Sequence, residues 1–208
     1  MIKKYLVLIC VVISVILIVI ATFVYPGGSL FDKNSTGFAW SKNFISNLFT
    51  EKAINGLVNT SRIWAITGMV FHSVGYGFFF MNMSKKISTK HSATILKLIG
   101  ISLILFNFLI VTPLHDIMVI ISSTLFLTGL FYITVSILKS KLHLLKFSCI
   151  ICFLIFYYTL YLYGSGNLGL LAIMQKVSFI CSILLVLGIE YFSKFEDFIT
   201  KNGNEYTI

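Results

Sequence analysis

Residues 25–62 read YPGGSLFDKNSTGFAWSKNFISNLFTEKAINGLVNTSR, a long polar stretch in a chain that is otherwise apolar. Apolar runs of about 20 residues, the length that crosses a bilayer as a helix, lie on both sides of it. The sequence therefore predicts a membrane protein in which a long loop joins the first two spans.

The composition of the whole chain supports this interpretation. Of its 208 residues, 58% are hydrophobic and 11% are charged, whereas soluble domains carry roughly 25% charged residues. Hydrocarbon accepts charged side chains only at a cost of a few kcal/mol each, so the low charge predicts several spans. The net charge of +9 does not indicate nucleic-acid binding, because most lysines lie in short clusters between apolar runs.

We expect an all-α integral membrane protein, with residues 1–208 forming a single six-helix bundle. The predicted spans are residues 5–25, 63–83, 94–112, 117–138, 147–163 and 168–192. The positive-inside rule then places three lysine clusters in the cytoplasm. We therefore predict a multi-pass protein of the bacterial plasma (inner) membrane, with cytoplasmic N- and C-termini and an extracytoplasmic loop over 26–62. Four basic residues scattered along that loop oppose this orientation, and the density of lysine in the inner clusters outweighs them.

Within the loop, residues 43–51 have helical periodicity. The polar stripe consists of Asn43, Ser46, Asn47, Thr50 and Glu51. The opposite face is apolar, so we predict a short amphipathic helix that lies in the membrane interface or roofs the bundle. Helices on lipid surfaces are usually rich in Lys and Arg, and this stripe of Asn, Ser and Thr favours an internal polar contact.

Ionisable residues gather on the side of the loop. His115 and Asp116 lie in the turn before the fourth span, Arg62 opens the second span, and Lys176 lies inside the sixth. We expect an outward-facing polar pocket under the loop helix, with Asp116 paired to Lys176 or Arg62. The candidate ligand-binding residues are Trp40, Asn43, Asn47, Arg62, His72, His115, Asp116 and Lys176.

Each of these residues also has a purely structural interpretation, which the sequence leaves open. Lys176 would snorkel, Arg62 would anchor a span at the interface, and Asp116 would cap a helix. His72 follows Gly68 and precedes Gly75 on one face of the second span, where small residues favour close helix packing.

We expect no cofactor and no metal. A haem would need two histidines at one depth, and His72 and His115 differ by about 13 Å along their helices. Three converging zinc ligands are not evident either. Cys149 and Cys152 have the spacing of a redox pair but lie in an apolar run, so we interpret them as packing residues.

Two resemblances to known families add to these expectations. The chain resembles the six-helix bacterial family called domain of unknown function 998. The resemblance rests on the sequence Ile45-Ser46-Asn47-Leu48, on Arg62 at the start of a span and on the Pro113…His115 turn. This chain has Phe49 where that family usually has Gly. A small helical bundle with histidines is also distantly similar to alkaline ceramidases, which are zinc amide hydrolases. Residues 168–192 lack the histidine pair of that family, which argues against a zinc amidase.

Three functions remain as hypotheses. The first is a non-catalytic pocket that binds a membrane lipid, another amphiphile or a partner membrane protein. The second is a membrane-embedded lipid hydrolase or transferase, with His115 or His72 as the base and Asp116 orienting it. The third is a small transporter, against which we find no matching pair of spans interrupted by Gly or Pro.

Overall fold

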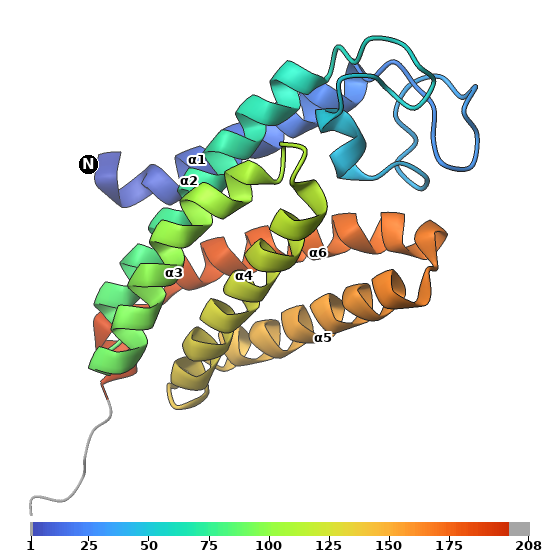
Figure 1. The fold of residues 1–208 in the computed structure, drawn as a ribbon. Coiled ribbons are helices and arrows are strands. Elements are labelled where there is room, and N and C mark those ends of the chain that lie inside the picture. The colour runs from blue at the N-terminus through green and yellow to red at the C-terminus, as the bar shows by residue number, and fades with distance from the viewer. Residues whose placement is uncertain (1, 200–208) are drawn as a thin grey trace, which may run out of the picture.

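The computed structural model describes residues 2–199 and contains six long α-helices (Figure 1). They are α1 Ile2–Phe23, α2 Arg62–Lys86, α3 Lys90–Leu109, α4 His115–Leu138, α5 His143–Ser165 and α6 Leu168–Phe192. Two 3-10 helices, η1 Ile45–Phe49 and η2 Phe195–Phe198, accompany them, and the described residues contain no β-strand. Residue 1 and residues 200–208 lie outside the described residues. These are the two chain ends, which we predict to be cytoplasmic.

All six α-helices are long and apolar enough to cross a membrane, so the fold is compatible with a multi-pass membrane protein. They lie at the six predicted apolar runs, and the main differences are at their ends. Lys85 and Lys86 belong to the last turn of α2, where the helix dipole favours cations. At the other end of the molecule, α5 stops at Gly166, whose φ of 71° is left-handed.

Small residues bring α1 and α2 together, as the spacing of the glycines predicts. A Cβ atom at Gly68 would lie 3.2 Å from the carbonyl of Ser14, and one at Gly75 would lie 3.1 Å from Cβ of Cys10. Such positions let two helix backbones approach closely. The predicted close-packing face of the second span is therefore confirmed.

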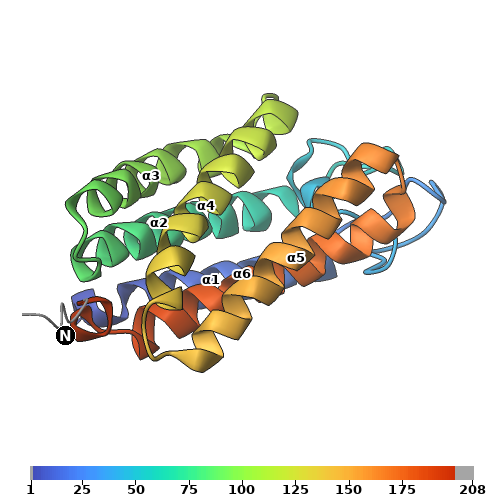
Figure 2. The ribbon, with the colours of Figure 1, turned by 90° about the horizontal axis from the view of Figure 1, so that it is seen from below.

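The remaining helices are arranged around this pair. On the other side of α2 lies α3, while α4 crosses from α3 to α5, and α5 runs antiparallel to α6 (Figures 1 and 2). One buried apolar core, with Phe79, Phe80 and Ile133 among its largest side chains, joins α2 to α4. Cys149 and Cys152 also lie in this core, and all four cysteines are free thiols.

The loop after α1 packs on the ends of α1 and α2 and turns sharply at its start. Gly27 and Gly28 have φ values of 137° and 83°, and a Cβ at Gly28 would collide with the backbone of Asn55. The Tyr25 hydroxyl fixes the turn by donating to the Gly28 carbonyl and accepting from the Ile54 N–H at 3.2 Å. Burial raises the pKa of the Tyr25 phenol, so it remains a donor at neutral pH.

The structure corrects the prediction of an amphipathic helix over 43–51. The helical part of the loop is η1, which has only five residues and is a 3-10 helix. The Oδ1 atom of Asn47 accepts the Phe44 N–H at 2.7 Å, and side chains that bond to the local backbone compete with an α-helix. Asn43 and Leu48 are both 0% exposed, so the segment does not divide into a wet face and a dry face.

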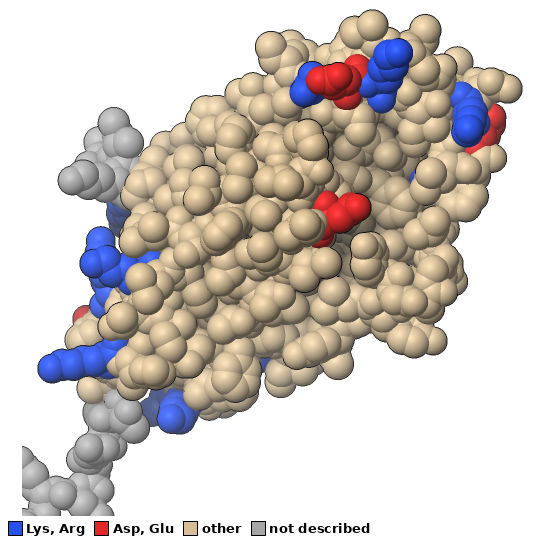
Figure 3. All heavy atoms as spheres, in the orientation of Figure 1, with Lys and Arg blue, Asp and Glu red and all other residues tan. Residues whose placement is uncertain are grey.

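Most charged side chains on the face in Figure 3 lie at two ends of the molecule, and one acidic patch lies near its middle. The loop end carries the long loop, the α3–α4 turn and the α5–α6 turn, and the opposite end carries the lysine clusters. Glu190 lies near the lysine end, where its sequence position suggests a solvated side chain. Its side chain is only 8% exposed, accepts a hydrogen bond from Asn82 Nδ2 at 2.7 Å, and lies 3.8 Å from Lys86 Nζ.

Candidate functional site

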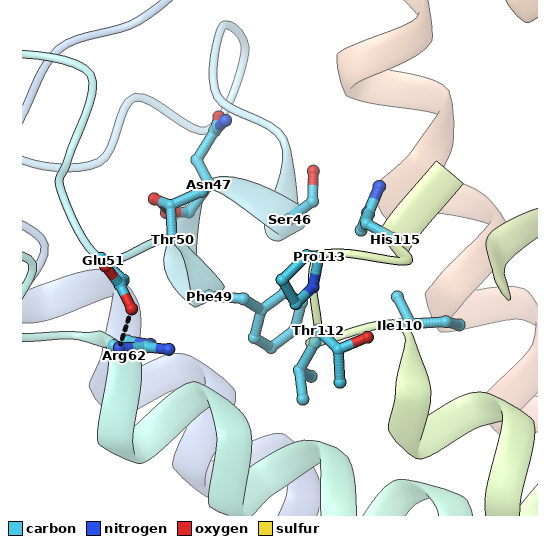
Figure 4. Close-up of a pocket in the computed structure, with 11 residues that line it drawn as sticks. Ser46, Asn47, Phe49, Thr50, Glu51, Arg62, Ile110, Thr112, Pro113 and His115 are labelled. Atoms are coloured by element: carbon cyan, nitrogen blue, oxygen red, sulfur yellow. Dashed lines mark hydrogen bonds and ion pairs between the residues drawn. The ribbon is translucent and has the colours of Figure 1, made fainter. Parts of the chain in front are cut away.

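The loop end holds an open groove of about 420 Å³, which we call the loop-end groove (Figure 4). The segment containing η1, the start of α2 and the turn between α3 and α4 form its walls. Its polar lining consists of Ser46, Asn47, Thr50, Glu51, Arg62, Thr112 and His115. Three of these, Asn47, Arg62 and His115, are candidate residues from the sequence.

Arg62 and Glu51 form an ion pair on one wall of the loop-end groove, with Nη1 and Oε1 3.2 Å apart. Both side chains reach solvent, being 42% and 80% exposed, so the pair contributes little to stability. The Nε atom of Arg62 is buried and has no hydrogen-bond partner among the described residues. Only the Nη1 end of the guanidinium is therefore paired within the described residues.

His115 stands on the opposite wall, at the start of α4 (Figure 4). Its Nδ1 atom lies 2.9 Å from Oδ1 of Asp116, which is the first acidic residue of the helix. Within the described residues, Asp116 pairs with neither of its predicted partners. Arg62 pairs with Glu51, and Lys176 bonds to the carbonyl of Asn43. The carboxylate of Asp116 projects into solvent, where local pairing with the neighbouring imidazole requires no charge burial.

Lys176 and Gln175 of α6 tie the loop to the bundle. Lys176 Nζ donates to the carbonyl of Asn43 at 2.6 Å, and Gln175 Oε1 accepts the N–H of Ile45 at 2.8 Å. The ammonium of Lys176 also lies 5.7 Å from the centre of the Phe38 ring. Lys176 lines neither the loop-end groove nor the larger cavity described below, so its observed contacts are structural.

Two further candidates from the loop also make structural contacts. The Nδ2 atom of Asn43 donates to the carbonyl of Gly28 at 2.7 Å, and its Oδ1 accepts the N–H of Ala39 at 2.9 Å. Trp40 is 52% exposed and packs edge-on against Phe38, with 5.5 Å between the ring centres. Neither Asn43 nor Trp40 lines a cavity.

A second cavity, of about 520 Å³, extends between the helices and is here called the bundle cavity. Its walls come from the loop and from every α-helix of the described chain. Most of the lining is apolar, and His72 and Asn107 are among its polar members. The bundle cavity adjoins the loop-end groove, because the two share the lining residues Ser46, Phe49, Ile110 and His115.

His72 is held in the wall of the bundle cavity by aromatic neighbours. Its ring centre lies 4.0 Å from that of Tyr76 and 5.2 Å from that of Phe179. The Tyr76 hydroxyl is bonded to Ser182 Oγ at 2.7 Å. The Nδ1 atom of His72 is buried and finds no partner within residues 2–199. The structure thus brings His72 and His115, which differ in depth, to one cavity.

Several polar residues of this cavity were not site candidates from the sequence, among them Ser14, Asn107 and Ser122. Ser14 had a visible signal, since no other hydroxyl interrupts the apolar run over 6–21. Ser122 had none, because it is one of several hydroxyl residues in its span. Within the described residues, no three His, Cys, Asp or Glu side chains converge as they would around a metal ion.

No family model, curated protein or solved structure matches the chain, so the family resemblances noted from the sequence remain predictions.

Proposed function

We propose that this protein is a multi-pass plasma-membrane protein that binds a lipid-like amphiphile in its bundle cavity. The observation that carries the proposal is the joining of a groove that holds the Arg62–Glu51 ion pair to a larger, mainly apolar cavity between the helices, through shared lining residues. A volume of about 520 Å³ lies within the roughly 300–1,000 Å³ of small-molecule sites, which are mostly apolar with a few polar groups. A cavity of this size between helices fits a small amphiphile better than a partner protein, which would need a broad surface.

The binding proposal is tested by filling the cavity. Val119 lines the bundle cavity, and Ile117, two residues earlier on α4, does not line it and is 58% exposed. V119F should lower the amount of lipid that co-purifies with the protein, measured by mass spectrometry of the extracted lipid, at least severalfold. I117F is the matched control and should retain the parental amount. Equal lipid in the parent and in both variants would overturn the proposal.

In the proposed orientation, the loop faces the extracytoplasmic side and the chain ends face the cytoplasm, as the lysine clusters favour. Lys33 in the loop and Lys139 after α4 are both exposed and lie at opposite ends of the molecule. A cysteine at position 33 should react with a membrane-impermeant maleimide in intact cells. One at position 139 should react only after the membrane is permeabilised, and the reverse pattern would invert the topology.

A second candidate function, a lipid hydrolase or transferase, draws support from the pairing of His115 with Asp116. A histidine whose Nδ1 faces a carboxylate 2.9 Å away is arranged as a general base, with Nε2 left to accept a proton. His115 also lines both the groove and the cavity, where the polar end of a bound lipid would lie. Hydrolysis of a lipid ester by the purified parent and its loss in H115A would support this activity. An inactive parent would count against it.

A further inference from the structure

Three buried polar atoms of the bundle cavity have no hydrogen-bond partner among the described residues. They are Oγ of Ser14 on α1, Nδ1 of His72 on α2 and Oγ of Ser122 on α4. The three residues are only 1%, 7% and 3% exposed. A buried polar atom without a partner costs about 1–3 kcal/mol, so a folded protein rarely keeps three around one space unless something else bonds to them.

The two serines differ from several hydroxyl residues on the same kind of helix, although Thr134, outside the cavity, also lacks a partner. Ser73 and Thr124 each donate to the carbonyl four residues earlier on their own helix, both at 2.8 Å, and Ser136 does so at 3.1 Å. Ser14 and Ser122 make no such bond, although their helices offer the same carbonyl. Their hydroxyls are therefore not bonded to their own helices, and both residues line the bundle cavity.

Packing between α1 and α2 places Ser14 and His72 at one level. Gly68 of α2 lies against the carbonyl of Ser14 on α1, and Gly75 lies against Cys10. Cys10 is one helical turn before Ser14 on α1, which runs antiparallel to α2. His72 falls between the two glycines on the same face of α2. Its side chain is therefore level with the turn of α1 that carries Ser14.

Ring contacts place Ser122 at the same level. The Tyr76 and Phe126 rings have their centres 5.7 Å apart, so these two residues are level with each other. His72 and Ser122 each lie four residues earlier, on helices that both run away from the loop end. They are therefore displaced from Tyr76 and Phe126 by the same helical turn, of about 5.4 Å.

Charge limits what can bind at this level. The lining of the bundle cavity contains no Asp, Glu, Lys or Arg side chain. The Arg62–Glu51 ion pair belongs to the loop-end groove, and the carboxylate of Asp116 beside His115 is 88% exposed and does not line the cavity. A fully charged group at the level of His72 would lose its hydration without gaining a fixed counter-ion, which costs several kcal/mol. A hydroxyl or carbonyl group needs only hydrogen bonds, and the three free atoms supply them.

We infer that the bundle cavity is selective for an amphiphile with an uncharged, hydrogen-bonding group. That group, a hydroxyl or a carbonyl, bonds to Ser14, His72 and Ser122, and the hydrocarbon chain occupies the apolar remainder of the cavity. Long-chain alcohols and monoacylglycerols have this chemistry, whereas alkyl phosphates and alkylammonium ions do not. The inference rests on the proposed function, because it specifies the ligand class of the same cavity.

Photolabelling tests this selectivity. The full-length protein in phosphatidylcholine nanodiscs is exposed to a long-chain alcohol carrying a chain diazirine, or to the alkyl phosphate with the same chain. Labelled residues are then located by mass spectrometry. We expect the alcohol to label the cavity walls at least fivefold more than the phosphate, and unlabelled 1-dodecanol to compete. Each serine hydroxyl contributes about 1 kcal/mol, so S122A should lower the alcohol labelling about fivefold.

Matched variants keep the outcomes distinguishable. T124V is the control, because Thr124 lines the same cavity but already donates to its own helix; it should label like the parent. S14A replaces S122A if that variant fails to fold, and it should lower the alcohol labelling to a similar extent. Equal cavity labelling by both probes, unchanged in S122A, would overturn the inference and leave the proposed binding function standing. No cavity labelling by either probe, together with unchanged lipid retention in V119F, would overturn both.

Discussion

Two sets of buried polar groups, one at the loop end and one in the bundle cavity, differ in whether they find partners. At the loop end, Asn43, Asn59 and Lys176 are buried and each makes two or more hydrogen bonds to the backbone. In the bundle cavity, Ser14 and Ser122 are equally buried and bond to no described residue. The first set holds the loop on the bundle, and the second set is free to hold something else.

The largest expected effect comes from breaking the loop end. N43A removes the acceptor of the Ala39 N–H and the donor to the Gly28 carbonyl, leaving two buried backbone groups without partners. The free energy of unfolding should fall by roughly 2–4 kcal/mol. Thermal unfolding in detergent measures this, with N34A, at an exposed position of the same loop, as the control. A loss as small as that of N34A would show that Asn43 does not fix the loop.

A smaller effect is expected where the loop meets α6. Q175L removes the acceptor of the Ile45 N–H and should destabilise the contact by about 1–2 kcal/mol. Limited proteolysis should then cut the loop faster while α1 to α6 remain protected. Q175E keeps an acceptor oxygen and should be cut at the parental rate, and equally fast cutting of Q175E would contradict this account of the contact.

Substitutions of the unpaired serines in the bundle cavity should not lower the stability of the ligand-free protein. S14A and S122A remove hydroxyls that bond to no described residue, so the ligand-free protein should be unchanged or stabilised by up to about 1 kcal/mol. Thermal unfolding after lipid has been stripped by detergent exchange is the measurement. A clear loss of stability in both variants would mean that these hydroxyls bond within the protein, and the contrast with the loop end would disappear.

The smallest effect is expected at the Arg62–Glu51 pair. E51Q removes the charge of a side chain that is 80% exposed and should change the free energy of unfolding by less than about 1 kcal/mol. Unfolding at low and high salt checks this, because the small contribution of an exposed pair falls further as salt screens it. A loss well above about 1 kcal/mol that persists at high salt would show that the pair organises the groove.

The two regions also differ in how far the sequence predicts them. The six helices were predictable because each apolar run is long enough to cross a bilayer and ends at lysine clusters or turn residues such as Gly166. The 3-10 form of η1 was not predictable from periodicity. A pattern of polar residues does not reveal that Asn43 and Asn47 bond to the backbone of the loop.

Sequence reasoning gathered several candidate residues at one end of the molecule but did not predict their pairs. The sequence placed Arg62 and His115 at one end, and both line the loop-end groove. The partner of Asp116 could not be predicted, because pairing depends on how the helices are spaced, and the nearest imidazole is its own neighbour. The free hydroxyls of Ser14 and Ser122 depend on helix rotation and on which carbonyls are left open, and neither property is visible in the sequence.

The most direct test of the central claim is an experimental density map of the protein in a lipid nanodisc. We predict continuous, elongated density in the bundle cavity, with one end within hydrogen-bonding distance of His72 Nδ1 and Ser122 Oγ. Discrete water-sized peaks at these atoms, or a cavity closed by repacked side chains, would contradict the claim that this space binds an amphiphile.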